Sequence, residues 1–104
     1  MALTIRMLDN LKRLGSFNLD PYVLTDHALM EMRRREITKD DVKKVMTSPE
    51  QKLDVRKGRC VYQSKLAYGE PTREYLVRVF VDIDREPNEV VTVYRTSRID
   101  KYWR

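Results

Sequence analysis

The single histidine of this chain, His27, lies in a segment that is rich in arginine. Histidine gains and loses a proton near pH 7 without a perturbed pKa, and arginine binds phosphate and carboxylate groups. On a helix, His27 lies roughly 11–12 Å along the axis from Arg34 and Arg35, which is too far for direct contact. This spacing fits two ends of a bound polyanion. It equally fits a histidine bonded to the backbone beside arginines that pair with Glu31 and Glu36.

A second group of polar residues is expected where two strands pair. If the last hairpin is centred near Glu86, Arg78 lies opposite Tyr94 and shares a face of the sheet with Thr92 and Thr96. An arginine in an otherwise apolar strand is costly unless it has a partner. Either a structural partner within the protein or a phosphate of a ligand satisfies that requirement.

Further cations gather at a turn and near the end of the sequence. Lys57 and Arg59 flank a glycine at an expected hairpin tip, where they either contact a phosphate backbone or lie in solvent. Arg95 and Lys101 alternate with aromatic residues. Aromatic rings that stack on bases, beside cations that contact phosphates, are typical of single-stranded RNA binding. The same aromatic residues can instead seal the core.

The composition excludes several classes of protein. The net charge is +5, with 36% charged and 41% hydrophobic residues, which is typical of a folded protein with a charged surface. A basic surface favours an anionic partner. One cysteine and one histidine exclude an internal disulfide and the usual zinc site, and no phosphate-binding glycine motif occurs. No apolar run reaches the ~20 residues of a membrane span and no signal peptide is visible, so we expect a cytoplasmic protein.

The expected elements are helices followed by strands. Residues 1–15 form an amphipathic helix, and residues 16–22 a linker. A second helix is capped by Thr25, and a third helix begins with a capping box of Thr38 and Asp41. From Lys52 onward the period changes to two, which predicts four strands. The sequence therefore predicts one α+β domain over residues 1–104, with N-terminal helices packed on a curled four-stranded antiparallel sheet.

Several segments resemble a known family. These are the pattern Thr-x-His-Ala…Met-x-x-Arg-Arg-Glu-Ile-Thr-x-x-x-Val over residues 25–42, the strands 59–62 and 76–79, the segment 91–96, and Lys101-Tyr102-Trp103. Together they resemble the domain of unknown function 4258 family over residues 22–103, with the N-terminal helix outside. Such domains are similar in layout to the small RelE/ParE-like toxins, which include metal-independent endoribonucleases. In those enzymes basic and aromatic side chains position the RNA, and a 2′-hydroxyl attacks the adjacent phosphate.

The resemblance implies a site without metal or cofactor. His27 is the base or acid, Arg35 and Arg78 stabilise charge, and Tyr94 donates a proton or stacks on a base. The residues expected to contact nucleic acid are Arg34, Lys57, Arg59, Thr92, Arg95, Thr96 and Lys101. Many relatives read Arg-Gly-Ile where this chain has Arg35-Glu36-Ile37, and a Glu36 that pairs with Arg35 weakens that arginine as a phosphate ligand.

Two functions follow as hypotheses. The first is an RNA-binding domain that cleaves RNA without metal. The second is a non-catalytic module that binds nucleic acid or a protein. The expected partner is RNA, with an antitoxin-like protein or a second copy of the chain bound through the N-terminal helix, and no membrane.

Overall fold

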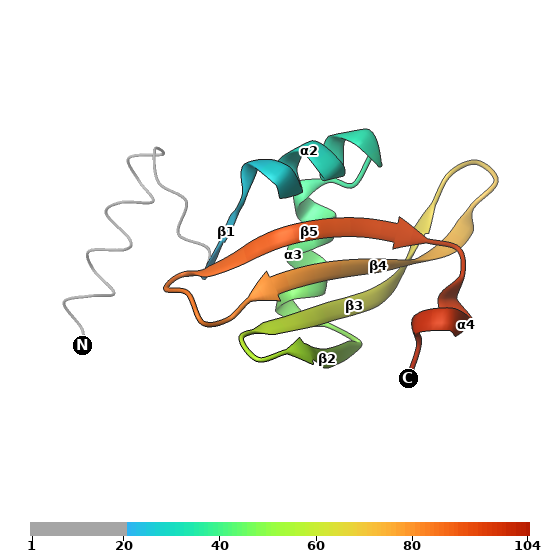
Figure 1. Ribbon diagram of the computed structural model, residues 1–104. Helices are drawn as coiled ribbons and strands as arrows, with labels where there is room; N and C mark the ends of the chain where they lie inside the picture. Colours follow the sequence, from blue (N-terminus) through green and yellow to red (C-terminus); the bar gives the residue numbers. More distant parts are fainter. Residues whose placement is uncertain (1–20) are drawn as a thin grey trace, which may run out of the picture.

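The computed structural model describes residues 21–104, which form a mixed sheet with helices (Figure 1). The element order is β1 (Tyr22–Leu24), α2 (Asp26–Arg34), α3 (Lys39–Thr47), β2 (Gln51–Arg56), β3 (Arg59–Tyr68), β4 (Arg73–Asp82), β5 (Asn88–Thr96) and α4 (Ile99–Tyr102). The five strands lie in the order β1-β5-β4-β3-β2. Four of them form an antiparallel meander, and β1 is added to it in parallel, against β5.

The predicted four-stranded antiparallel sheet behind N-terminal helices is therefore wrong. A strand precedes α2 and α3, the sheet has five strands, and the β1–β5 pair is parallel. Tyr22 belongs to β1 and not to the predicted linker. Three residues are too few to show an alternating pattern. The partners of β1 lie more than 60 residues later, with Tyr22 opposite Asn88 and Leu24 opposite Val90. The predicted helix over residues 1–15 lies outside the described residues.

Both predicted helix starts in the described part of the chain are confirmed. The Thr25 side chain accepts a hydrogen bond from the Ala28 amide at 3.1 Å. Thr38 and Asp41 form the reciprocal capping box of α3. Thr25 also joins α2 to β5, because its amide donates to the Val90 carbonyl at 3.1 Å. The beginning of α2 is thus fixed beside the first half of β5.

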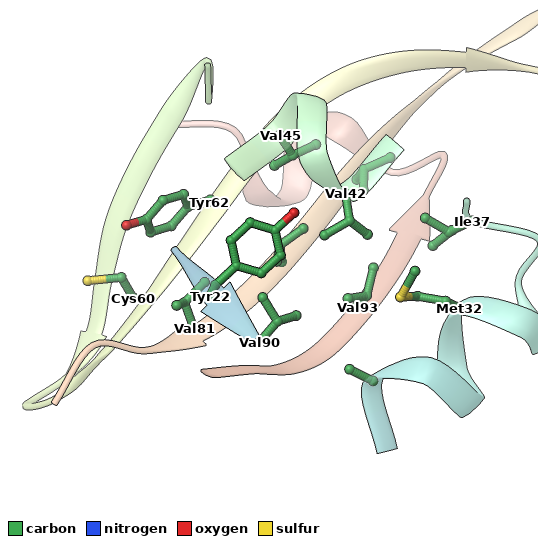
Figure 2. Packing of buried hydrophobic residues seen from close by; sticks show 13 residues of the cluster. Tyr22, Met32, Ile37, Val42, Val45, Cys60, Tyr62, Val81, Val90 and Val93 are labelled. Atoms are coloured by element: carbon green, nitrogen blue, oxygen red, sulfur yellow. The ribbon is translucent and has the colours of Figure 1, made fainter. Parts of the chain in front are cut away.

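The core lies between the sheet and the two longer helices (Figure 2). In α3, Val42 and Val45 are fully buried, and α2 contributes Ala28 and Met32. The sheet face toward these helices carries buried residues from every strand except β2: Tyr22, Cys60, Tyr62, Val77, Val79, Val81, Val90 and Val93. Burying this apolar surface is the main force that holds the helices against the sheet.

The pairing of β4 with β5 has the predicted register. Arg78 lies opposite Tyr94 and Phe80 opposite Thr92, with an irregularity between Phe80 and Val81. Because side chains alternate along a strand, these four residues lie on the face opposite the core valines. β4 is the middle strand, as the two-sided apolar pattern indicates. Arg78 is therefore in the centre of the sheet, on the face away from α3.

Candidate nucleic-acid interface

Arg78 is held in a fixed position by neutral groups. Its Nε donates to Gln63 Oε1 at 2.8 Å, and its Nη1 donates to Tyr94 Oη at 2.7 Å. Both partners are on neighbouring strands, with Gln63 on β3 and Tyr94 on β5. The cross-strand register thus aligns three polar side chains in a row across the sheet.

Aromatic rings surround the Arg78 guanidinium. Its Cζ lies 4.3 Å from the ring centroid of Tyr102, 5.2 Å from Phe80 and 5.8 Å from Tyr94. Tyr102 comes from α4, which places this short helix on the sheet face opposite α3. A cation over an aromatic face is stabilised by the ring quadrupole, and this stabilisation neutralises none of its charge. Arg78 and these three rings are called the Arg78 cluster below.

Gln63 connects the Arg78 cluster to α4 and β2. It is fully buried, and its Nε2 donates to Gln51 Oε1 at 2.8 Å and to the Tyr102 carbonyl at 3.1 Å. The amide is therefore satisfied on both its oxygen and its nitrogen. Because Gln63 is uncharged, it orients Arg78 and leaves the positive charge intact. Among residues 21–104, Arg78 forms no ion pair.

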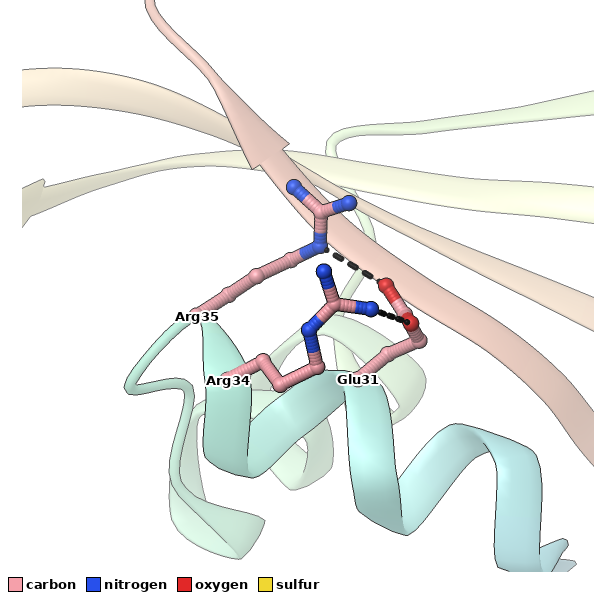
Figure 3. Close-up of polar contacts among 3 residues, drawn as sticks. All are labelled: Glu31, Arg34 and Arg35. Atoms are coloured by element: carbon pink, nitrogen blue, oxygen red, sulfur yellow. Dashed lines mark hydrogen bonds and ion pairs between the residues drawn. The ribbon is translucent and has the colours of Figure 1, made fainter.

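Arg35 reaches the Arg78 cluster from α2. Its Cζ lies 5.9 Å from the Tyr94 ring centroid, and its Nε donates to Glu31 Oε2 at 3.0 Å. Arg34 bonds the other oxygen of the same carboxylate at 3.0 Å (Figure 3). The hydrogen bond from Arg35 lowers the pKa of Glu31, and the charge of Arg34 lowers it further. One carboxylate is thus shared by two arginines.

Glu36 does not take the role that the sequence suggested. Arg35 pairs with Glu31 instead, one helical turn earlier. Glu36 has a φ of 55°, in the left-handed region that glycine favours. Its backbone ends α2 and lets the chain turn into α3, in a conformation that glycine adopts without strain. The expected pairing of Glu36 with Arg35 is therefore wrong.

His27 lies apart from the Arg78 cluster. It is exposed in the first turn of α2, and α2 runs beside β5 from Val90 toward Tyr94. His27 is close enough to Glu31 for its charge to contribute to the lowered pKa of that carboxyl. It is about 12 Å along the helix from Arg35. The structure thus brings together Arg35, Arg78 and Tyr94 of the four residues expected to be catalytic, and it leaves His27 two turns away.

The other expected contact residues are divided among several surfaces. Thr92 and Thr96 lie on the face of β5 that carries Tyr94, and Lys101 lies 5.3 Å from the Tyr102 ring. Lys57 is exposed at the β2–β3 turn. Arg59 is engaged within the protein, because it donates two hydrogen bonds to Asp82 at 2.6 and 3.1 Å. The hairpin tip thus presents Lys57 rather than the predicted pair.

Two tyrosines of the Arg78 cluster have opposite pKa shifts. Burial raises the pKa of Tyr94, and the hydrogen bond from Arg78 offsets part of that increase. A hydrogen bond with Tyr94 lowers the pKa of Tyr102, and the nearby charges of Lys101 and Arg78 act in the same direction. Tyr102 and Gln63 were not expected as site residues. The signal for Tyr102 was the aromatic and cationic pattern of residues 101–104, whereas Gln63 has no sequence signal.

The described part of the chain contains no cluster of side chains that could bind a metal ion. Among residues 21–104, no group of three or more acidic, histidine or cysteine side chains is arranged to hold a metal ion. None of the helices over the same residues is long and apolar enough to span a membrane.

Comparison with known proteins identifies the family. The family model described as "Domain of unknown function (DUF4258)" matches residues 24–95. The chain belongs to this family. No curated protein and no solved structure matches the chain.

The DUF4258 match covers most of the Arg78 cluster. It includes Arg78, Phe80 and Tyr94 of the cluster, together with the neighbouring Arg35 and Gln63. It ends at the next-to-last residue of β5, before α4 supplies Tyr102. The polar row across the sheet therefore lies within the matched DUF4258 segment, and the ring that covers Arg78 lies beyond it.

Proposed function

We propose that this DUF4258 protein binds single-stranded RNA at the Arg78 cluster. The observation that carries the proposal is an arginine that is fixed by neutral partners and aromatic rings, with its charge unpaired among the described residues. Such a guanidinium is preorganised for an anion, and its planar fork matches phosphate geometry.

The surroundings of Arg78 favour RNA over a small anion. Tyr94 and Tyr102 are partly exposed aromatic residues, and their rings meet edge to face with centroids 6.3 Å apart. Stacking of a base on an aromatic ring contributes about 1–3 kcal/mol, and it tolerates any base. Arg35 adds a second cation beside Tyr94. Stacking and phosphate contacts in one place are the features that single-stranded RNA requires.

Binding is tested by fluorescence anisotropy with a labelled oligouridylate of about 12 nucleotides. We expect Arg78→Gln to weaken binding about tenfold or more, since a charge-assisted hydrogen bond to phosphate is lost. The matched control is Arg85→Gln, the same change at an exposed residue of the β4–β5 turn, with an expected effect below about twofold. Circular dichroism reports whether each variant is folded. Equal affinities of the two variants, or no binding by the wild type, would favour the protein-binding alternative.

A second candidate function is metal-independent cleavage of the bound RNA. The observation that favours it is Tyr102, whose ring centroid lies 4.3 Å from the Arg78 Cζ. A hydrogen bond with Tyr94 lowers the pKa of Tyr102, and the charges of Lys101 and Arg78 lower it further. The chemistry that we propose is that of metal-independent endoribonucleases. The 2′-hydroxyl attacks the adjacent phosphorus, a base takes the hydroxyl proton, and an acid protonates the departing 5′-oxygen. Cleavage thus leaves a 2′,3′-cyclic phosphate and a 5′-hydroxyl.

Cleavage is tested by incubating RNA with the protein in the presence of a metal chelator. In this proposal Tyr102 and Tyr94 transfer the protons, because His27 lies two helical turns from Arg35. We expect Tyr102→Phe to reduce the rate of cleavage by about 100-fold or more, while His27→Ala stays near the wild type. Loss of activity in His27→Ala alone would assign the proton transfer to the histidine. If the RNA stays intact after incubation with the wild type, the protein binds RNA and does not cleave it.

A further inference from the structure

Arg95 is a second arginine that aromatic rings hold in place. It follows Tyr94 on β5, so it lies on the opposite face of the sheet, on the side of α3. Its Cζ is 4.1 Å from the ring centroid of Tyr68 and 5.0 Å from that of Tyr75. The Tyr68 hydroxyl donates to Asp41 at 2.9 Å, which fixes that ring. Like Arg78, Arg95 forms no ion pair among residues 21–104.

The ion pairs divide the arginines of this region into two types. Arg34 and Arg35 share Glu31. Arg78 and Arg95 instead rest on tyrosines. Ring contacts hold the side chains without neutralising them, so these two cations retain the greater attraction for an outside anion.

Arg95 lines a pocket together with two other arginines. The pocket has a volume of about 470 Å³, and Arg34, Arg35 and Arg95 all contribute to it. The hydroxyl residues Thr96 and Ser97 are on its wall, and Glu36 is the acidic residue of its lining. Three guanidinium groups exceed the charges of Glu36 in the lining and of Glu31, which Arg34 and Arg35 share, so the pocket remains positive and offers several N–H donors. That is the donor set that a phosphate requires.

Arg35 belongs to the pocket and also lies beside the Arg78 cluster. It lines the pocket with Arg95, and its Cζ is 5.9 Å from the ring of Tyr94 on the other face. β1 pairs with β5 only through Val90, so the second half of β5 has no strand on that side. Three cations therefore lie in series around this edge of the sheet, with Arg35 between Arg78 on one face and Arg95 on the other.

We infer that this pocket holds a second phosphate of the RNA strand that binds at Arg78. The strand then crosses the edge of β5, with one phosphate at the Arg78 cluster and a later one among Arg34, Arg35 and Arg95. This inference rests on the proposed RNA binding. It adds a separate subsite and makes the ligand a strand that spans both faces, rather than a single nucleotide.

The test is the affinity for the same oligouridylate, measured at several salt concentrations. For single strands, the log of the association constant falls linearly with the log of the salt concentration, and each phosphate contact contributes about −0.7 to the slope. We expect Arg95→Gln to weaken binding about tenfold or more and to make the slope shallower by about 0.7. Arg85→Gln removes an equal charge in the β4–β5 turn, and we expect it to leave the slope unchanged.

A second measurement does not depend on how a variant folds. In the wild-type protein, the Nε–H resonances of arginine side chains are followed by NMR as oligouridylate is added. We expect the signals of both Arg78 and Arg95 to shift. If only Arg78 shifts and Arg95→Gln behaves like Arg85→Gln, the pocket is not a phosphate subsite, although the proposed function stands. If wild type binds no RNA, both proposals are overturned.

Discussion

At the scale of single residues, Glu36 holds a backbone conformation that glycine would adopt at a lower cost. Glu36 has a φ of 55°, which costs a residue with a Cβ of the order of 1 kcal/mol relative to glycine. We therefore expect Glu36→Gly to raise the free energy of unfolding by about 0.5–1 kcal/mol, as measured by urea denaturation. Glu36→Ala is the control, because it removes the same carboxylate and keeps the Cβ. Equal stabilities of the glycine and alanine variants would contradict the backbone explanation.

The pair of Arg59 and Asp82 predicts a dependence of stability on pH. The two hydrogen bonds from Arg59 lower the pKa of Asp82 below its unfolded value. A lowered pKa stabilises the fold above the unfolded pKa of about 4, and this contribution is lost as the pH falls through the folded pKa. In Asp82→Asn, we expect stability to decline less steeply than in the wild type below about pH 4. Thermal unfolding at pH 7 and near pH 3 measures the difference, and parallel declines would show that this pair is not responsible.

At the scale of elements, local capping signals predicted the starts of α2 and α3, whereas the short α4 has no side-chain cap and was not predicted. Thr38 and Asp41 satisfy each other's backbone amides at the start of α3, whose Val42 and Val45 are fully buried. We expect Thr38→Ala to lower the free energy of unfolding by about 1 kcal/mol. Thr47→Ala at the exposed end of the same helix is the control, with an expected change below about 0.5 kcal/mol. Both variants are measured by urea denaturation. Equal midpoints for the two variants would contradict the stabilising role of the cap.

The elements that the sequence did not predict depend on distant partners. The pairing of Arg78 with Tyr94 could be predicted from the turn near Glu86, because a hairpin fixes its own register. The three residues of β1 have no periodic signal, and they pair with β5, which lies more than 60 residues later in the sequence. Gln63 likewise reads as an ordinary strand residue. Its role follows from its alignment with Arg78 across β3 and β4.

At the scale of the whole molecule, folding concentrates positive charge at one edge of the sheet. The net charge of +5 is spread along the sequence, with no basic tail. Folding brings Arg35, Arg78 and Arg95 together around one edge of the sheet. Composition could predict a basic surface but not this edge, since α2 must first lie along β5. An anion that meets the folded protein is therefore attracted more strongly here than the net charge alone implies.

This concentration of charge predicts how RNA binding responds to salt. Two phosphate contacts, one at Arg78 and one among Arg34, Arg35 and Arg95, give a slope of about −1.4 when the log of the association constant is plotted against the log of the salt concentration. The affinity for oligouridylate should then fall about sevenfold between about 50 and 200 mM salt. Sucrose at matched osmolality is the control, and we expect it to leave the affinity unchanged because it releases no counterions. A slope near zero would mean that stacking on tyrosines, rather than contact with phosphates, holds the strand at this edge.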